Sequence, residues 1–167
     1  MDQNDAPSLH LALPSAEATD ALARRLAPCL AAGDTLLLEG DIGAGKTHFA
    51  RALIRERLGP AGQWEDIPSP TFTLVQTYDT GDATIWHADL YRLTSPQEVW
   101  ELGLEDAFSN AICLVEWPDR LGPARPADAL TLSFQALPDD TRRLAVSASG
   151  PRSYALLAAF GSGGGDD

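Results

Sequence analysis

The sequence predicts an α/β fold of three layers, in which a mixed central β-sheet is flanked by helices. Three observations support this prediction. Residues 34–39 and 111–117 are short, almost continuously apolar runs, which is typical of buried strands. Residues 46–58 repeat apolar side chains at helical spacing, directly after a glycine-rich loop. Residues 71–78 and 83–88 flank a short turn, which indicates a hairpin and makes the sheet mixed.

The N-terminal third begins with residues 1–12, which we expect to be a flexible N-terminus. Ser15 is expected to cap a helix, because its hydroxyl can accept a hydrogen bond from a backbone N–H of the first turn. Apolar side chains then repeat along one face of this helix at Leu22, Leu26 and Leu30. Gly33 is expected to end the helix. The strand at 34–39 leads from there directly into Gly40.

The second half of the chain predicts further elements. Pro96 favours the first turn of a short helix, since its missing N–H has no partner there. Residues 128–136 and 142–148 are predicted to be two late strands of the same sheet, and residues 153–160 a short terminal helix. Residues 13–160 therefore form one domain, and the glycine-rich tail at 161–167 is expected to be disordered.

The glycine-rich loop carries the most specific signal. Residues 40–47 read GDIGAGKT, which fits the phosphate-binding pattern G-x-x-x-x-G-K-[S/T] in its required strand–loop–helix context. Lys46 is the one lysine beside eleven arginines, and a compact ammonium on a flexible stem can fold over such a loop toward β- and γ-phosphates. We therefore expect a three-layer P-loop NTPase domain, with the phosphates held by Ile42, Gly43, Ala44, Gly45, Lys46 and Thr47.

A P-loop site also needs a carboxylate near the metal ion. Thr47 is expected to offer its hydroxyl to Mg²⁺, and two acids are candidates to act beside it. Glu116 closes the apolar run at 111–117, and Asp89 follows the strand at 83–88. The alternative for Glu116 is an exposed acid at a strand end. For Asp89 it is a helix or turn cap beside a surface histidine, His87. If Glu116 binds the metal, the strands at 34–39 and 111–117 must lie close together.

Composition narrows the function further. The 167 residues carry a formal net charge of −12, which argues against an independent grip on RNA or DNA. With no second lysine, the chain cannot form the Asn/Thr-Lys-x-Asp segment by which GTP-binding switch proteins read guanine, so adenine is favoured. The start lacks the pattern of a signal peptide, no apolar run approaches the length of a membrane span, and two isolated cysteines suggest reduced thiols. We expect a cytoplasmic protein that makes no membrane contact.

Four motifs, in order, resemble those of the TsaE (YjeE) family. They are GDIGAGKT at 40–47, SPTFTLV at 69–75, HADLYRL at 87–93 and ICLVEWP at 112–118. The segment LGLED at 102–106 is also similar. The resemblance covers about residues 13–147. His48 stands where that family commonly has a small hydroxyl residue.

The resemblance implies an ATPase of the bacterial machinery that adds threonylcarbamoyl to the adenosine beside the anticodon of certain tRNAs. It implies TsaD and TsaB as protein partners, contact with tRNA only through them, and ATP and Mg²⁺ as cofactors. It implies phosphate binding by residues 42–47, Mg²⁺ binding by Thr47 and Glu116, and action near the γ-phosphate by Asp89. Lys46 and Thr71 complete the implied catalytic set. Adenine contacts are expected from about residues 13–16 and near Thr141.

Two other functions agree with the P-loop alone. A small-molecule P-loop kinase is one, with the stretch around Arg120 and Arg125 in the place of a lid. A binding module controlled by nucleotide occupancy, without turnover, is the other.

Overall fold

The computed structural model describes residues 8–60 and 67–164 of the chain. In this described part of the chain, seven strands form one sheet in the order β1-β7-β6-β2-β5-β4-β3. The four central strands β6, β2, β5 and β4 run parallel, whereas β3, β7 and β1 pair antiparallel toward the edges. The strands are β1 Ser8–Leu13, β2 Thr35–Glu39, β3 Val75–Asp79, β4 Thr84–Asp89, β5 Ile112–Glu116, β6 Leu130–Ala136 and β7 Arg142–Ala148. The predicted mixed sheet is confirmed.

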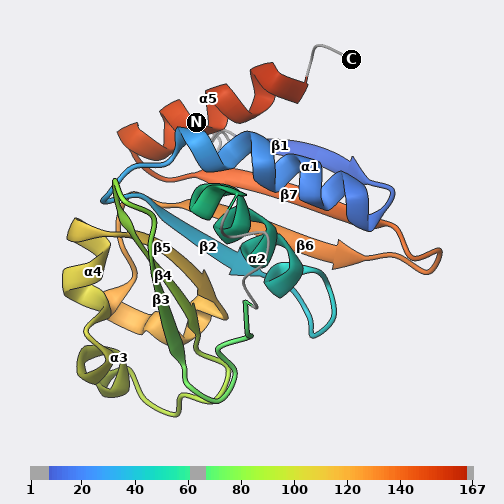
Figure 1. Ribbon diagram of the computed structural model, residues 1–167. Helices are drawn as coiled ribbons and strands as arrows, with labels where there is room; N and C mark the ends of the chain where they lie inside the picture. The colour runs from blue at the N-terminus through green and yellow to red at the C-terminus, as the bar shows by residue number, and fades with distance from the viewer. Residues whose placement is uncertain (1–7, 61–66, 165–167) are drawn as a thin grey trace, which may run out of the picture.

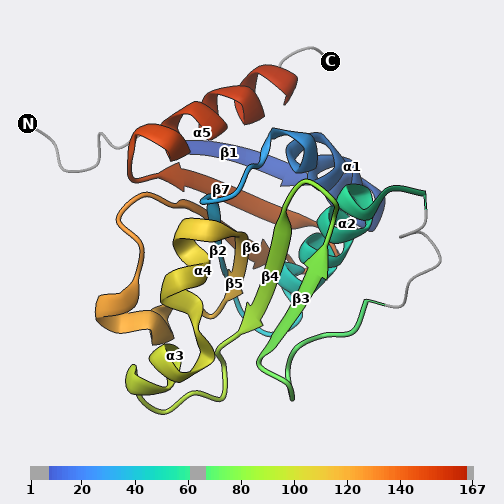
Figure 2. The same ribbon diagram turned by 60° about the vertical axis from the view of Figure 1, so that its left-hand side comes forward.

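Helices cover both faces of the sheet (Figures 1 and 2). One face packs against α1 Ala16–Leu26, α2 Lys46–Leu58 and α5 Pro151–Gly164. The other packs against α3 Gln97–Leu102, α4 Leu104–Asn110 and the 3-10 segment Pro118–Ala124. In β2 the side chains alternate between these layers, with Leu36 and Leu38 in the first core and Leu37 in the second. The three-layer α/β architecture is therefore confirmed.

The strand–loop–helix unit around the motif forms as predicted. The buried strand β2 ends at Glu39, and α2 begins at Lys46 and ends at Leu58 before Gly59. Strand β5 pairs with β2 in parallel, so the expected neighbourhood of the two apolar strands is confirmed. Parallel strands on each side bring their carboxyl ends to the same edge of the sheet, where the loop lies.

The N-terminus was predicted wrongly in part. Residues 8–13 form the edge strand β1, which pairs antiparallel with β7, instead of a flexible end. Alternate leucines account for this, because Leu13 is buried and Leu9 and Leu11 pack on the core beside α1. Residues 1–7 lie outside the described residues.

Helix boundaries also differ from the predictions. Ser15 caps α1 as expected, accepting a hydrogen bond from Ala18 N at 3.2 Å. The α-helix ends at Leu26, well before Gly33, because Pro28 cannot donate a helical hydrogen bond and a 3-10 turn follows. At the other end, α5 runs to Gly164, so residues 161–164 are helical where disorder was predicted. Residues 165–167 lie outside the described part.

The segment before the hairpin is the third difference. Residues 70–73 form a turn and β3 begins only at Val75, whereas a strand was predicted from residue 71. Leu74 has a φ of 70°, a left-handed backbone that a continuous strand cannot contain. The turn frees Thr71 from the sheet and places it beside β4.

No helix in the described residues is both long and apolar enough to cross a bilayer.

Candidate functional site

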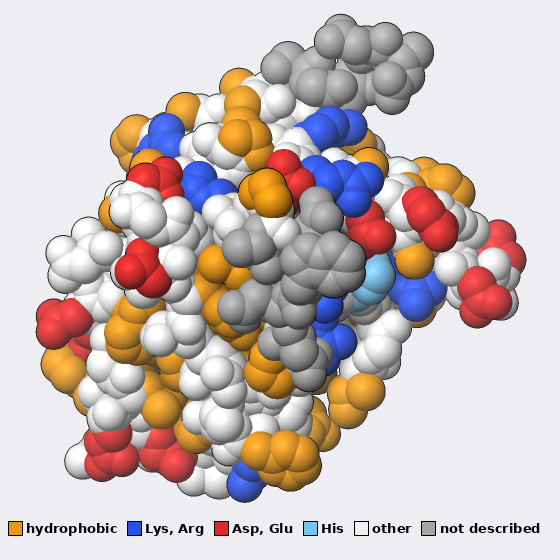
Figure 3. Space-filling view, in the orientation of Figure 1, with side chains coloured by type: hydrophobic (Ala, Val, Ile, Leu, Met, Phe, Trp, Pro, Cys, Tyr) orange, Lys and Arg blue, Asp and Glu red, His pale blue; other side chains and the backbone are white. Residues whose placement is uncertain are grey.

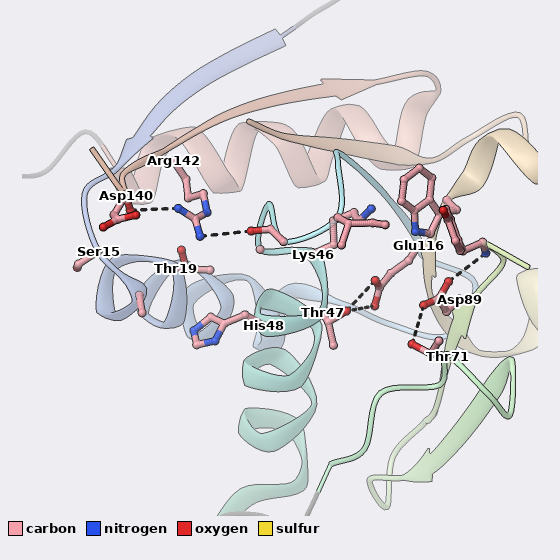
Figure 4. Close-up of a pocket in the computed structure, with 16 residues that line it drawn as sticks. Ser15, Thr19, Lys46, Thr47, His48, Thr71, Asp89, Glu116, Asp140 and Arg142 are labelled. Carbon is pink, nitrogen blue, oxygen red and sulfur yellow. Dashed lines mark hydrogen bonds between the residues drawn. The ribbon is translucent and has the colours of Figure 1, made fainter. Parts of the chain in front are cut away.

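A cavity of about 570 Å³ lies at the carboxyl edge of the parallel strands, between the glycine-rich loop, α1 and the start of β7 (Figure 4). The motif residues line it together with side chains from five other segments (Ser15, Ala16, Thr19, Ile42, Gly43, Gly45, Lys46, Thr47, His48, Thr71, Asp89, Tyr91, Glu116, Trp117, Asp140 and Arg142). A cavity at this edge of an α/β sheet is where such folds bind ligands.

The loop depends on glycine at its entry. Gly40 has a φ of 140°, and a Cβ there would lie 2.5 Å from the carbonyl oxygen of Phe134 in β6. The backbone at residue 40 passes so close to β6 that only glycine, which has no Cβ, fits there. Gly45 also has a positive φ, 115°, and immediately precedes the first turn of α2. The loop consequently ends at the N-terminus of a thirteen-residue helix, whose free N–H groups favour an anion.

Lys46 folds back over this loop. Its side chain is buried, and Nζ donates a hydrogen bond to the carbonyl oxygen of Gly40. Nζ also lies 3.6 Å from the centre of the Trp117 ring, a cation–π contact. Burial lowers the pKa of Lys46 from its ordinary value, while the nearby carboxylates of Glu116 and Asp89 act in the opposite direction. The ammonium is thus held inside the loop, in the midst of acidic groups.

Thr47 and Glu116 meet directly. Thr47 Oγ1 lies 2.8 Å from Oε1 and 2.9 Å from Oε2 of Glu116. Glu116 is 1% exposed, so the interpretation of it as a surface acid at a strand end is wrong. Its Oε2 also lies 2.7 Å from Nε2 of His87, a fully buried histidine of β4.

Asp89 lies beside Glu116 across paired strands, since β4 and β5 place these two residues in register. Asp89 Oδ1 accepts the backbone N–H of Tyr91 at 3.0 Å, and Oδ2 accepts from Thr71 Oγ1 at 3.3 Å. The alternative of a turn cap is correct for Oδ1 but incomplete, because Asp89 also lines the cavity, and its neighbour His87 is fully buried where a surface histidine was expected. The turn at residues 70–73 is what brings Thr71 to it.

Arg142, at the start of β7, holds the outer side of the loop. Its Nε donates to the carbonyl oxygen of Ala44 at 3.0 Å, and Nη2 to that of Gly43 at 3.3 Å. The same guanidinium contacts the carbonyl oxygens of Asp140 and Thr141. Two carbonyl oxygens of the loop are thereby bonded to one side chain, which fixes the loop against β7. From the sequence, Arg142 was one of four arginines, with Arg92, Arg120 and Arg143, that could reach a nucleotide, but nothing in the sequence ranked it above the others or predicted its contact with the loop.

The far end of the cavity is lined by Ser15, Ala16 and Thr19 of the α1 segment, by His48 and by Asp140. His48 Nε2 lies 2.8 Å from Asp20 Oδ1, which joins the first turn of α2 to α1. The resemblance implied adenine contacts from about residues 13–16 and near Thr141. Ser15 and Ala16 from the first of these segments, and Asp140 beside Thr141, do lie at this end of the cavity.

Most of the predicted site is brought together. Eight of the nine predicted residues line the cavity, namely Ile42, Gly43, Gly45, Lys46, Thr47, Thr71, Asp89 and Glu116. Ala44 does not: it is 1% exposed, and its N–H donates to the carbonyl oxygen of Asp41. Trp117, the residue after Glu116, also lines the cavity and lies over Lys46. Arg120 and Arg125 do not line the cavity, and they lie 4.0 and 3.8 Å from the carboxylates of Asp119 and Glu39.

The donor atoms suit a hard cation. A threonine hydroxyl and two carboxylates converge at one end of the cavity, and oxygen is the ligand that Mg²⁺ prefers. Among the described residues no group of three or more His, Cys, Asp or Glu side chains could hold a metal ion alone. That arrangement fits Mg²⁺, which is commonly bound by one or two protein groups together with substrate phosphates and water.

Comparison with known proteins agrees with the geometry. The family model "Threonylcarbamoyl adenosine biosynthesis protein TsaE" matches residues 13–144. A Rickettsia bellii protein named tRNA threonylcarbamoyladenosine biosynthesis protein TsaE is 42% identical over 130 residues, which cover 78% of this chain and 88% of the relative. A Bacillus subtilis protein of the same name is 37% identical over 142 residues, covering 84% and 85%.

A solved structure is similar over nearly the whole fold. The crystal structure of Bacillus subtilis YdiB superposes with a TM-score of 0.78 at 28% sequence identity, and covers 97% of this chain and 99% of that one. The family match spans the loop, both carboxylates and Thr71. The chain therefore belongs to the TsaE family.

Proposed function

We propose that this chain is a Mg²⁺-dependent ATPase that supports repeated threonylcarbamoylation of tRNA by a TsaB–TsaD complex. One observation carries the proposal: Lys46 and Thr47 at the start of α2, Asp89 at the end of β4 and Glu116 at the end of β5 converge on one cavity. The names of the relatives support the pathway, and the oxygen donors support Mg²⁺ with ATP.

Phosphate binding would be the work of the loop. The amide groups of Gly43, Gly45 and Thr47, at the positive end of α2, suit the β- and γ-phosphates. Lys46 already lies within this loop, so its ammonium would exchange the carbonyl of Gly40 for phosphate oxygens. Thr47 and Glu116 would hold Mg²⁺, which neutralises charge that develops on the phosphates.

Asp89 is suited to orient the attacking water. Two donors, the Tyr91 N–H and the Thr71 hydroxyl, fix its carboxylate and leave lone pairs that can accept from water. An oriented water is the main requirement for hydrolysis, because phosphoryl transfer depends on positioning and electrostatics. Adenine would occupy the end of the cavity near Ser15 and His48.

Protein partners suit the surface better than tRNA. Two large apolar side chains near the cavity are strongly exposed, Phe72 at 86% and Ile42 at 74%. On the part of the face in Figure 3 that the structure describes, acidic and basic side chains are interspersed instead of forming one basic surface. Together with a net charge of −12, this favours docking on TsaB and TsaD in the cytoplasm, with tRNA held by those partners.

The test is ATP hydrolysis by the purified protein with and without TsaB–TsaD. We expect a slow rate alone and clear stimulation by the partners, and equal rates would overturn the proposal. Hydrolysis that requires an added small acceptor would instead identify a kinase, although Arg120 and Arg125 lie outside the cavity. If Glu116→Gln stops hydrolysis while docking and tRNA modification persist, occupancy without turnover is the function.

A further inference from the structure

His87 is a buried polar side chain that the proposed mechanism does not use. It lies in β4, is 0% exposed, and does not line the cavity. In register it pairs with Leu114 of β5, so it occupies a position where an aliphatic side chain would be usual. A buried polar group costs stability unless it is hydrogen-bonded, so its partner indicates what the residue does.

That partner is the proposed metal ligand. His87 Nε2 lies 2.7 Å from Glu116 Oε2, and both side chains are almost completely buried. Thr47 bonds the same carboxylate from α2. The carboxylate is therefore held between β4 and the first turn of α2 by protein side chains.

The hydrogen bonding indicates the tautomer of the ring. Among the described residues, Nδ1 of His87 is buried and has no hydrogen-bond partner. A proton on Nδ1 would leave an unsatisfied N–H, whereas a proton on Nε2 is donated to Glu116. We therefore assign the ring proton to Nε2, so that histidine is the donor and the carboxylate the acceptor.

We propose that His87 is a positioning residue, which orients the Glu116 carboxylate toward Thr47 and so raises the affinity of the site for the metal. This rests on the proposed function, in which Glu116 and Thr47 hold Mg²⁺. A donor behind a ligand fixes the ligand's orientation, and its loss commonly lowers metal affinity about 10- to 100-fold. His87 acts through Glu116 and contacts no substrate.

The test separates hydrogen bonding from packing. His87→Leu fills the site without a donor, whereas His87→Gln retains an N–H at nearly the reach of Nε2. ATP affinity is measured for each variant in EDTA and across a Mg²⁺ titration. Thermal melting shows that each variant is folded.

We expect all three proteins to bind ATP about equally in EDTA. The Mg²⁺ concentration that gives half of the affinity gain should rise about 10- to 100-fold in His87→Leu and stay near the wild-type value in His87→Gln. An unchanged Mg²⁺ requirement in His87→Leu would overturn the proposal, and so would a glutamine variant that behaves like leucine. If wild-type protein shows no gain from Mg²⁺, the proposed function itself fails.

A second measurement does not use the His87 variants. Nitrogen-15 NMR of the metal-free wild-type protein reports which ring nitrogen of His87 carries the proton. We expect an exchange-protected proton on Nε2 that becomes exposed to exchange in Glu116→Ala. A proton on Nδ1 would overturn the assignment and the proposal with it.

Discussion

Replacing Arg142 with methionine tests whether the hydrogen bonds from this side chain hold the glycine-rich loop in its binding conformation. Methionine keeps an unbranched stem of similar length but donates no hydrogen bonds, so the carbonyl oxygens of Ala44 and Gly43 lose their partner. The partly buried bond at 3.0 Å counts for about 1.5 kcal/mol, and the exposed one at 3.3 Å for about 0.5 kcal/mol. If between half and all of this energy holds the loop in its binding conformation, the Kd for ATP rises about 5- to 30-fold.

The assay is calorimetric binding of ATP and of inorganic tripolyphosphate. A loop that loses its shape should weaken both ligands, whereas loss of a direct contact with the nucleoside would weaken ATP alone. Arg143→Met is the matched control, since Arg143 is exposed on the same strand and does not line the cavity. Wild-type affinity of Arg142→Met for both ligands would refute the reasoning.

Three further predictions follow from single positions. Lys46→Ala should abolish ATP hydrolysis while circular dichroism remains that of the wild type; continued turnover would contradict the assigned role. Gly40→Ala should lower the free energy of unfolding by about 2 kcal/mol or more, because its Cβ would lie 2.5 Å from a backbone oxygen of β6. In Gly43→Ala the new Cβ meets no atom within 4 Å, so this control variant should lose less stability. A denaturant titration of both variants measures the difference. Burial raises the pKa of Cys113 to about 12, so iodoacetamide at pH 8 should modify the exposed Cys29 and spare Cys113 until the chain unfolds. As the Cys113 thiol ionises more easily in the unfolded chain, it should also make stability fall as the pH rises above about 9, a slope that Cys113→Ala should lack.

The sequence predicted the glycine-rich loop, its helix, the hairpin and the two central strands, because each depends on residues close together in the chain. The loop and its helix were predictable because glycines at special backbone angles, a lysine and a threonine must occur at fixed spacing. The hairpin of β3 and β4 and the two buried strands β2 and β5 were predictable from the pattern of polar and apolar residues along the chain. Their adjacency followed from the requirement that Glu116 reach Thr47, and the structure places these side chains 2.8 Å apart.

Features that depend on distant pairing were not predictable. Whether residues 8–13 form a strand depends on β7, which lies more than a hundred residues away in the chain. The contacts of His87 with Glu116 and of Arg142 with the loop likewise join segments that only the folded sheet brings together. A single histidine or arginine in a sequence gives no sign of such a contact.

The most direct test of the proposed role counts tRNA modifications per TsaB–TsaD complex. The complex is supplied with excess tRNA, threonylcarbamoyl donor, ATP and Mg²⁺, with wild-type protein, with Lys46→Ala, or with neither. We predict many modifications per complex with the wild-type protein, and about one or fewer without it or with the variant. Equal numbers of modifications in all three reactions would contradict the account.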